Sequence, residues 1–409
     1  MPDSAQQSMN TLTAQWYNAV TTGLNLDPST FQLIQSNAPL GTTSPQLWAY
    51  FDALPPLSVT NFFNPSQFSS FAQNYGAVVM NLVPGNSTTW LRLMGDYYTK
   101  WIAYLQTSPQ IPTGGMVALF SNWAMLNLPN PSTAQAAITA YKQTFNSAIG
   151  VAVNMYANAL AAGGGFAYSN TYENLTAQLP SSPSGSVVMD SATTSSDISQ
   201  SWAQGQVQGA YDIFWGQASA SYDALTQQFA GAQVQVNASF QRVMQFAAGP
   251  LAQPSQDPIL SGYTPWYNSA ALGIAYQTSD NTVWNNTPPT WQSTFGQNGT
   301  LQRVCSALIV VDGIDITITS GAQFSSSEQQ SFSSAASGGV WPFFAVSGSG
   351  GWSSNVSFSD AGEVTVTSSL PAGNPQILGC VVTPISAVLA NQQVVQQTAR
   401  LEAAALLAR

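Results

Sequence analysis

The spacing of hydrophobic residues changes along the chain near residue 303. Before this point, apolar residues recur every three or four positions in several stretches that begin with a small polar residue and a proline, a pattern that predicts amphipathic helices. After it, Ile314, Ile316 and Ile318 alternate with Asp and Thr, and a two-residue period predicts β-strands. The pattern therefore predicts an α+β fold in which a helical N-terminal part precedes an antiparallel sheet.

Two stretches of the first half predict long helices. Residues 132–162 contain no proline and a single glycine, Gly150. Residues 195–248 contain a seam in which aromatic and apolar residues follow one another in steps of four and three, as in a coiled coil. We expect this seam to pack on helix 132–162 of the same molecule, with pairing between copies as the alternative. The candidate seam residues are Tyr211, Trp215, Tyr222, Leu225, Phe229 and Val236.

The last third of the chain predicts a sheet followed by a helix. Residues 303–312 and 376–385 are nearly continuous apolar runs, typical of central strands that are covered on both faces. Residues 386–409 have the spacing of an amphipathic terminal helix. The predicted domains are thus a helical domain over 1–250, an aromatic and Pro-rich connector over 251–302, an antiparallel β domain over 303–385 and a C-terminal helix over 386–409.

A Ser/Gly-rich insertion, residues 321–355, interrupts the predicted β domain. Its arms carry one charge, Glu328, and surround a compact apolar stretch. Polar arms with an apolar tip are the layout of the hairpins that β-barrel pore formers insert into bilayers, although the arms lack the alternation of a lipid-facing strand. The alternative is a plug buried between sheet and helices. The candidate inserting tip comprises Val340, Trp341, Pro342, Phe343, Phe344 and Val346.

Charged residues are scarce. The chain has 7 Lys and Arg and 17 Asp and Glu in 409 residues, a charged fraction of 6% against roughly 25% in ordinary globular proteins. A net charge of −10 without a basic cluster argues against nucleic acid as a partner, because Lys and Arg must neutralise its phosphates. Few repelling charges favour self-association, so we expect a homo-oligomer. The N-terminus lacks the basic and apolar regions of a signal peptide, so we expect synthesis without one and any export by another route.

Catalytic chemistry is poorly represented. The chain contains no histidine, which removes Ser-His-Asp and Cys-His catalysis and most transition-metal sites. Carboxylates such as Asp312 and Asp315 show no spacing typical of a hydrolase pair. We therefore expect no enzyme, no cofactor and no metal. Cys305 and Cys380 fall in strand-like segments of one region, where they form either a disulfide or two buried thiols.

These features favour a non-enzymatic, membrane-active protein, pore-forming or toxin-like, that acts as an oligomer on a lipid membrane. A second interpretation is a self-assembling structural or interaction protein without a membrane role. A third is a carbohydrate-binding protein or a carboxylate-dependent hydrolase. The carbohydrate interpretation rests on Trp266, Trp284 and Trp291 of the connector, which would stack on sugars unless they are buried as plugs over the helical core.

Overall fold

The computed structural model of the chain describes residues 4–33, 40–55, 70–84, 88–107, 109–199, 220–335 and 351–390. These residues form helices and an antiparallel sheet, so the fold is α+β, as the periodicity predicts. The chain divides into two compact units, each made of three separate segments. Unit 1 comprises residues 1–68, 172–248 and 305–382, and unit 2 comprises 69–171, 249–304 and 383–409.

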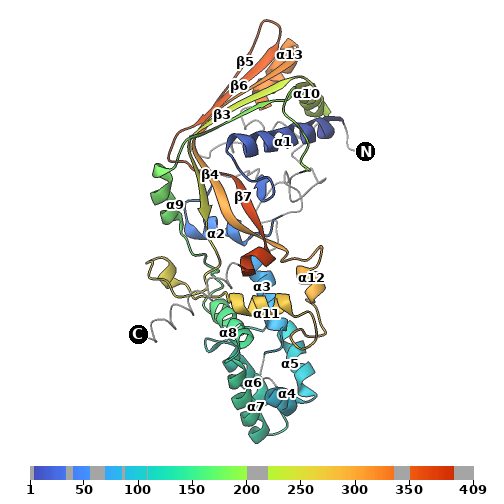
Figure 1. The fold of residues 1–409 in the computed structure, drawn as a ribbon, viewed down its shortest axis with the longest axis vertical. Coiled ribbons are helices and arrows are strands. Elements are labelled where there is room, and N and C mark those ends of the chain that lie inside the picture. Colours follow the sequence, from blue (N-terminus) through green and yellow to red (C-terminus); the bar gives the residue numbers. More distant parts are fainter. Residues whose placement is uncertain are drawn as a thin grey trace. The chain divides into compact units, whose positions relative to one another are not determined.

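Unit 1 is built on a seven-stranded sheet (Figure 1). The strand order is β1-β7-β4-β3-β2, with β6 also paired to β4 and β5 paired to β6. The strands are β1 Phe31–Leu33, β2 Gly185–Asp190, β3 Val234–Ala247, β4 Arg303–Gln323, β5 Ser353–Phe358, β6 Glu363–Leu370 and β7 Gln376–Pro384. Strand β3 pairs with β4, which follows residue 302, and β2 pairs with β3. The predicted division into consecutive helical and β domains therefore differs from the observed units.

Strand β4 contains both sequence patterns that predict strands. Its residues from Ala307 to Ile314 are buried, and from Asp315 onward exposed or half-buried positions alternate with buried ones. Gly313 lies between the two halves with a φ of 63°, a left-handed conformation that glycine adopts without strain. Strand β6 pairs with β4 from Ile314 onward, whereas β4 lies beside β7 before this point.

The helices of unit 1 pack on this sheet. They are α1 Ser4–Gly23, α2 Ser44–Asp52, α9 Tyr172–Gln178, α10 Ala220–Ala230 and α13 Ser326–Ala335, with a short 3-10 turn η2 at Leu179–Ser181. Helix α1 contacts both β2 and α10, and Figure 1 shows it along one face of the sheet. Its buried side chains, among them Leu12, Trp16 and Val20, join one hydrophobic core with the inward-facing residues of β2, β3, β4 and β6.

The predicted long helix over 195–248 is wrong. Residues 220–230 are helical, but residues 234–247 form strand β3, and residues 200–219 lie outside the described part of the chain. Val234, Val236, Ala238 and Phe240 alternate with polar residues and are buried, whereas the residues between them are exposed. This two-residue period decides the structure because β2 and β4 pair with β3 on both sides, while its apolar face packs in the core with side chains of α1 and α10.

The other predicted long helix, 132–162, is two helices, α7 Pro131–Thr144 and α8 Ala148–Ala161. The break follows from a capping residue, since the Ser147 hydroxyl accepts a hydrogen bond from the backbone N–H of Gly150 at 3.1 Å and so starts a new helix. The predicted terminal helix begins in the structure at residues 385–390, and its remainder lies outside the described residues.

Unit 2 is a helical layer with an aromatic core. Besides α7 and α8 it contains α3 Phe71–Asn81, α4 Thr88–Met94, α5 Tyr97–Gln106, α6 Gly115–Asn127, α11 Ser269–Gln277, α12 Trp291–Phe295 and the 3-10 turn η3 at Leu260–Gly262. Phe120 and Tyr141 have ring centroids 4.2 Å apart, and Trp90 and Trp101 contact both rings. Trp266 and Trp284 of the predicted connector are buried in this unit, and Trp291 is half-buried. The first two therefore have the burial expected of plugs.

Candidate functional site

Four strands of unit 1 begin or end together at one end of the sheet. Strands β2 and β4 finish there, and β3 and β6 start there. The register places Asp190 opposite Gln235 and Gln323 opposite Glu363. We call this region the helix-covered end, because α10 and α13 pack over it.

Two connections start and finish at the helix-covered end. The first connection, residues 191–233, joins β2 to β3 and contains α10. The second connection, residues 324–362, joins β4 to β6 and contains α13 and β5. Both therefore join strands that are antiparallel neighbours in the sheet. A straightened connection would prolong its two strands as a β-hairpin.

Four phenylalanines attach the two connections to the sheet and to each other. Phe229 comes from α10, Phe324 precedes α13, Phe332 lies within α13 and Phe358 ends β5. The centroids of their contacting rings are 5.4 to 6.3 Å apart. Phe229 and Phe332 are fully buried. Hydrophobic contacts are non-directional, so burial of these rings in another apolar environment can replace their burial in the protein.

Direct polar contacts between the first connection and β4 are hydrogen bonds to backbone carbonyls. The Gln228 side-chain amide donates to the carbonyl of Gln323 at 2.7 Å. The Ser320 hydroxyl donates to the carbonyl of Phe229 at 3.0 Å. In the described residues of this end, no ion pair joins α10 or α13 to the strands.

Helix α13 depends on a capping carboxylate. The backbone N–H and the hydroxyl of Ser325 both donate to Oε2 of Glu328, at 2.8 and 2.6 Å. These hydrogen bonds, that of the hydroxyl first, lower the pKa of Glu328. Half of the helix, SSEQQSFSSA, is serine, which forms helices less readily than alanine. Its helical state therefore rests on the cap and on Phe332 more than on intrinsic propensity.

The second connection returns to the sheet through the β5–β6 hairpin. Ser354 and Ser368 face each other across it with hydroxyl oxygens 2.8 Å apart, and Ser353 and Ser369 with oxygens 2.6 Å apart. Strand β5 lies at one edge of the sheet and β2 at another. In the described part of the chain, neither has a second strand partner.

The predicted seam residues do not form one helical seam. Leu225 and Phe229 are buried in α10, whereas Val236 is buried in β3. Tyr222 belongs to α10, and its side chain is outside the described part. Also outside it are Tyr211, Trp215 and the entire candidate tip, Val340, Trp341, Pro342, Phe343, Phe344 and Val346.

The two cysteines are free thiols buried in neighbouring strands, Cys305 in β4 and Cys380 in β7. Burial, and then a hydrogen bond with Cys305, raises the pKa of Cys380 well above its ordinary value. A protonated, buried thiol is a poor nucleophile and a poor metal ligand.

The carboxylate of Asp312 is buried and forms an ion pair and hydrogen bonds within unit 1. It is fully buried and 2.6 Å from the guanidinium of Arg242, and it accepts hydrogen bonds from the N–H groups of Gly373 and Asn374. Asp312 thus holds the β6–β7 turn against the bend of β4. Asp315 is exposed, so the two carboxylates have different environments.

Nothing in the order of the residues groups Phe229, Phe324, Phe332 and Phe358, because strand pairing brings these distant segments together. Among the described residues no group of three or more Cys, Asp or Glu is arranged to hold a metal ion. No described helix combines the length and the apolar character that crossing a membrane requires. Comparisons of the chain with protein-family models, with curated proteins and with solved structures find no match.

Proposed function

We propose that the protein is a non-enzymatic, membrane-active, pore-forming protein that acts as a homo-oligomer. In this proposal the two connections leave the sheet and extend into a bilayer as β-hairpins. The topology of the helix-covered end carries the proposal, since each connection joins two antiparallel neighbours at the same end of the sheet. An extended connection prolongs strands that are already paired, so its backbone groups find partners, as a lipid environment requires.

The first connection has the length and the pattern of a membrane hairpin. A spanning strand takes roughly 9–11 residues, and residues 191–233 exceed two such arms. Over 203–213, Ala, Gly, Val, Tyr and Ile occupy the odd positions, and Gln occupies most of the even ones. Over 217–224, Ala and Tyr alternate with Gln, Ser and Asp, even though residues 220–224 are helical in α10. Such alternation is the sequence signature of strands with one lipid-facing and one water-facing side.

The second connection has this pattern in its returning arm. Over 346–358 the even positions include Val346, Trp352, Val356 and Phe358, and the odd positions are Ser, Gly or Asn. The apolar stretch 340–346 precedes this arm and supports its assignment as the tip that enters the bilayer first. The outgoing arm, 325–338, lacks the alternation, so the second connection supports the proposal less strongly than the first.

The composition of the two connections limits the energetic cost of insertion. The first connection contains three charged residues, Asp197, Asp212 and Asp223, and the second contains two, Glu328 and Asp360. Because charged side chains in a bilayer are costly, this small number limits the cost of insertion. Helix α13 is held by buried Phe332, and α10 by Leu225, Phe229 and its contact with α1. Burial of these apolar side chains in lipid would replace their burial in the protein. The edges β2 and β5 offer backbone groups for pairing between copies, which supports assembly into an oligomer.

Dye release from protein-free liposomes tests the proposal with a matched pair of variants. Val207→Lys places a charge on the side that the pattern assigns to lipid, and Gln206→Lys places it on the side assigned to water. A lysine at the bilayer midplane costs about 2–4 kcal/mol, so we expect Val207→Lys to slow release at least tenfold and Gln206→Lys to leave it unchanged. Equal release by the two variants would refute the hairpin.

The candidate tip has its own test in the same assay. Trp341→Ser removes the largest apolar side chain of the stretch and should reduce release, because a large apolar side chain contributes to membrane entry. Absence of any release by the unmodified protein, across lipid compositions and pH, would overturn the membrane role. Concentration-dependent particles without lipid would then support the self-assembling alternative.

A further inference from the structure

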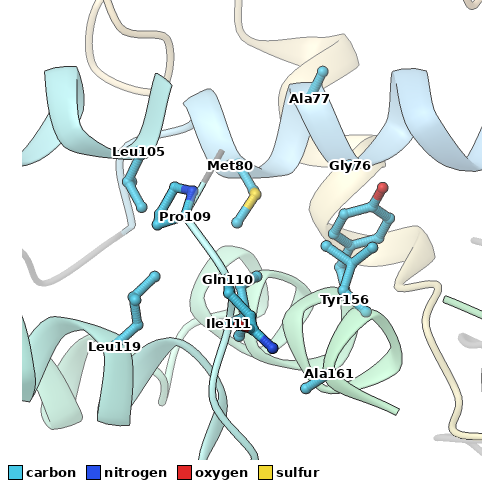
Figure 2. A pocket seen from close by; sticks show the side chains of 11 residues that line it. Gly76, Ala77, Met80, Leu105, Pro109, Gln110, Ile111, Leu119, Tyr156 and Ala161 are labelled. Atoms are coloured by element: carbon cyan, nitrogen blue, oxygen red, sulfur yellow. The ribbon is translucent and has the colours of Figure 1, made fainter. Parts of the chain in front are cut away.

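Unit 2 contains a cavity that the proposed function does not use. It lies among α3, α5, α6, α8 and the segment between α5 and α6 (Figure 2), and its volume is about 440 Å³. Small-molecule sites in proteins typically measure roughly 300–1,000 Å³. The large apolar side chains of the lining are Met80, Leu105, Ile111, Leu119 and Leu160.

Among the described residues of the lining none is charged. Its polar side chains are those of Gln110 and Tyr156, from the α5–α6 segment and from α8. An ion placed inside would lose its hydration without gaining a partner, which is strongly unfavourable. A hydrocarbon, by contrast, gains about 25 cal/mol for each Å² of apolar surface that it buries. The chemistry of the lining therefore selects an apolar ligand.

The cavity has a fixed wall. The Tyr156 ring stacks on Phe166 with centroids 5.2 Å apart and meets Tyr75 edge-on at 6.1 Å. Gly76 permits this position, because a Cβ atom at residue 76 would overlap the Tyr156 ring. A wall held in this way keeps its shape without a ligand, and a preformed site loses less entropy on binding.

The cavity has a direction from floor to mouth. Leu119 and Tyr156 are buried, whereas Gln110 and Leu160 are exposed. In Figure 2, Met80 projects from α3 toward the middle of the cavity. An elongated ligand therefore places its apolar end against the buried side chains and its polar end at the mouth, within the neighbourhood of the Gln110 amide.

We propose that this cavity binds the hydrocarbon chain of a free fatty acid or of a membrane lipid, with the polar head group at the mouth beside Gln110. The inference rests on the lining of unit 2 alone and does not depend on pore formation. Free fatty acid and lipid present the same chain, and they differ in whether the ligand must be extracted from a bilayer.

Binding is measured with dansyl-labelled undecanoate, whose fluorescence rises in apolar surroundings. We expect saturable binding of one probe per chain and displacement of the probe by palmitate. Ile111→Trp and Met80→Trp fill the cavity from two half-buried positions and should each weaken binding at least tenfold. Val151→Trp adds the same side chain at an exposed position of α8 outside the lining and should leave binding unchanged.

The displacement experiments distinguish a free fatty acid from a membrane lipid as the ligand. Displacement by palmitate assigns a free fatty acid, and displacement by phosphatidylcholine vesicles alone assigns a lipid tail. The proposal is overturned if the probe does not bind saturably, or if both cavity variants bind it as tightly as the unmodified protein. Near-ultraviolet circular dichroism of each variant shows that loss of binding does not come from loss of the fold.

Discussion

Asp312 and Glu328 show how much of this structure depends on two carboxylates in a chain with few charges. Asp312 lies where β4 bends and holds the β6–β7 turn through backbone N–H groups. Glu328 caps the serine-rich helix of the second connection. In a protein with so few ionic groups, each such contact has few substitutes nearby.

Replacing the buried carboxylate should destabilise the protein markedly. Asp312→Asn keeps the shape of the side chain but weakens its contacts with Arg242 and with two N–H groups, and hydrogen bonds to charged groups are worth about 1.5–3 kcal/mol. We expect a loss of that order in the free energy of unfolding, measured by urea denaturation. The matched control is Asp315→Asn at an exposed position of the same strand, with an expected change within about 0.5 kcal/mol. Equal effects would contradict the anchoring role.

Acid should loosen the second connection through Glu328. Its pKa is lowered in the folded protein, so its contribution to stability is complete above the pKa of the unfolded chain, roughly 4.3, and is lost as the pH falls through the lower folded value. We expect faster backbone hydrogen exchange in residues 326–335 at about pH 3, after correction for intrinsic exchange rates. Glu328→Gln should remove this pH dependence, and its persistence in the variant would assign it to another group.

At the scale of elements, the helix-covered end joins secondary structure of low intrinsic stability to a well-paired sheet. Helices α10 and α13 span residues 220–230 and 326–335, lengths at which isolated helices are marginal in water. Phe332 attaches α13 to the phenylalanine cluster, whereas α10 contributes Phe229 to this cluster and also packs on α1. Regions held by few buried contacts open most easily. Phe332 is the one buried side chain among those described in α13, so α13 is expected to leave the sheet first.

Removing one ring should release α13 without unfolding the sheet. Phe332→Ala deletes a buried ring in contact with Phe229, Phe324 and Phe358, a substitution that costs about 3–5 kcal/mol in a packed core. We expect at least tenfold faster hydrogen exchange in α13 and faster dye release. Ser331→Ala on the exposed side of the same helix is the control, and equal exchange in the two variants would contradict the attachment by Phe332.

Sequence periodicity predicts the correct element here where a segment fits only one period. The alternation over 313–320 and the apolar run over 303–312 are both found in β4. The steps of four and three through Phe229 and Val236 mislead, because β3 carries a two-residue period as well and pairing with β2 and β4 favours it. The hydrophobic pattern of one segment does not reveal which strand will pair with it. The grouping of the four phenylalanines, which depends on strand pairing, therefore could not be predicted from the sequence.

At the scale of the whole molecule, low charge and unpaired strand edges favour association. Edge strand β2 carries Val188, which is 68% exposed, and edge strand β5 is rich in serine. Few charged residues on these edges oppose pairing between copies. We expect sedimentation to detect large oligomers when liposomes are present. Val188→Lys on edge β2 should reduce both oligomer formation and dye release, whereas oligomers that form equally without lipid would favour the structural alternative.

A reversible disulfide across the β5–β6 hairpin tests most directly whether the second connection must leave the sheet. Ser354→Cys and Ser368→Cys replace hydroxyl oxygens that lie 2.8 Å apart, so the new thiols come within reach of each other, and each single variant is the control. We predict that the oxidised double variant releases dye at least tenfold more slowly than the single variants, and that reduction restores release. Release by the oxidised protein at the full rate would contradict the extension of this connection into the membrane.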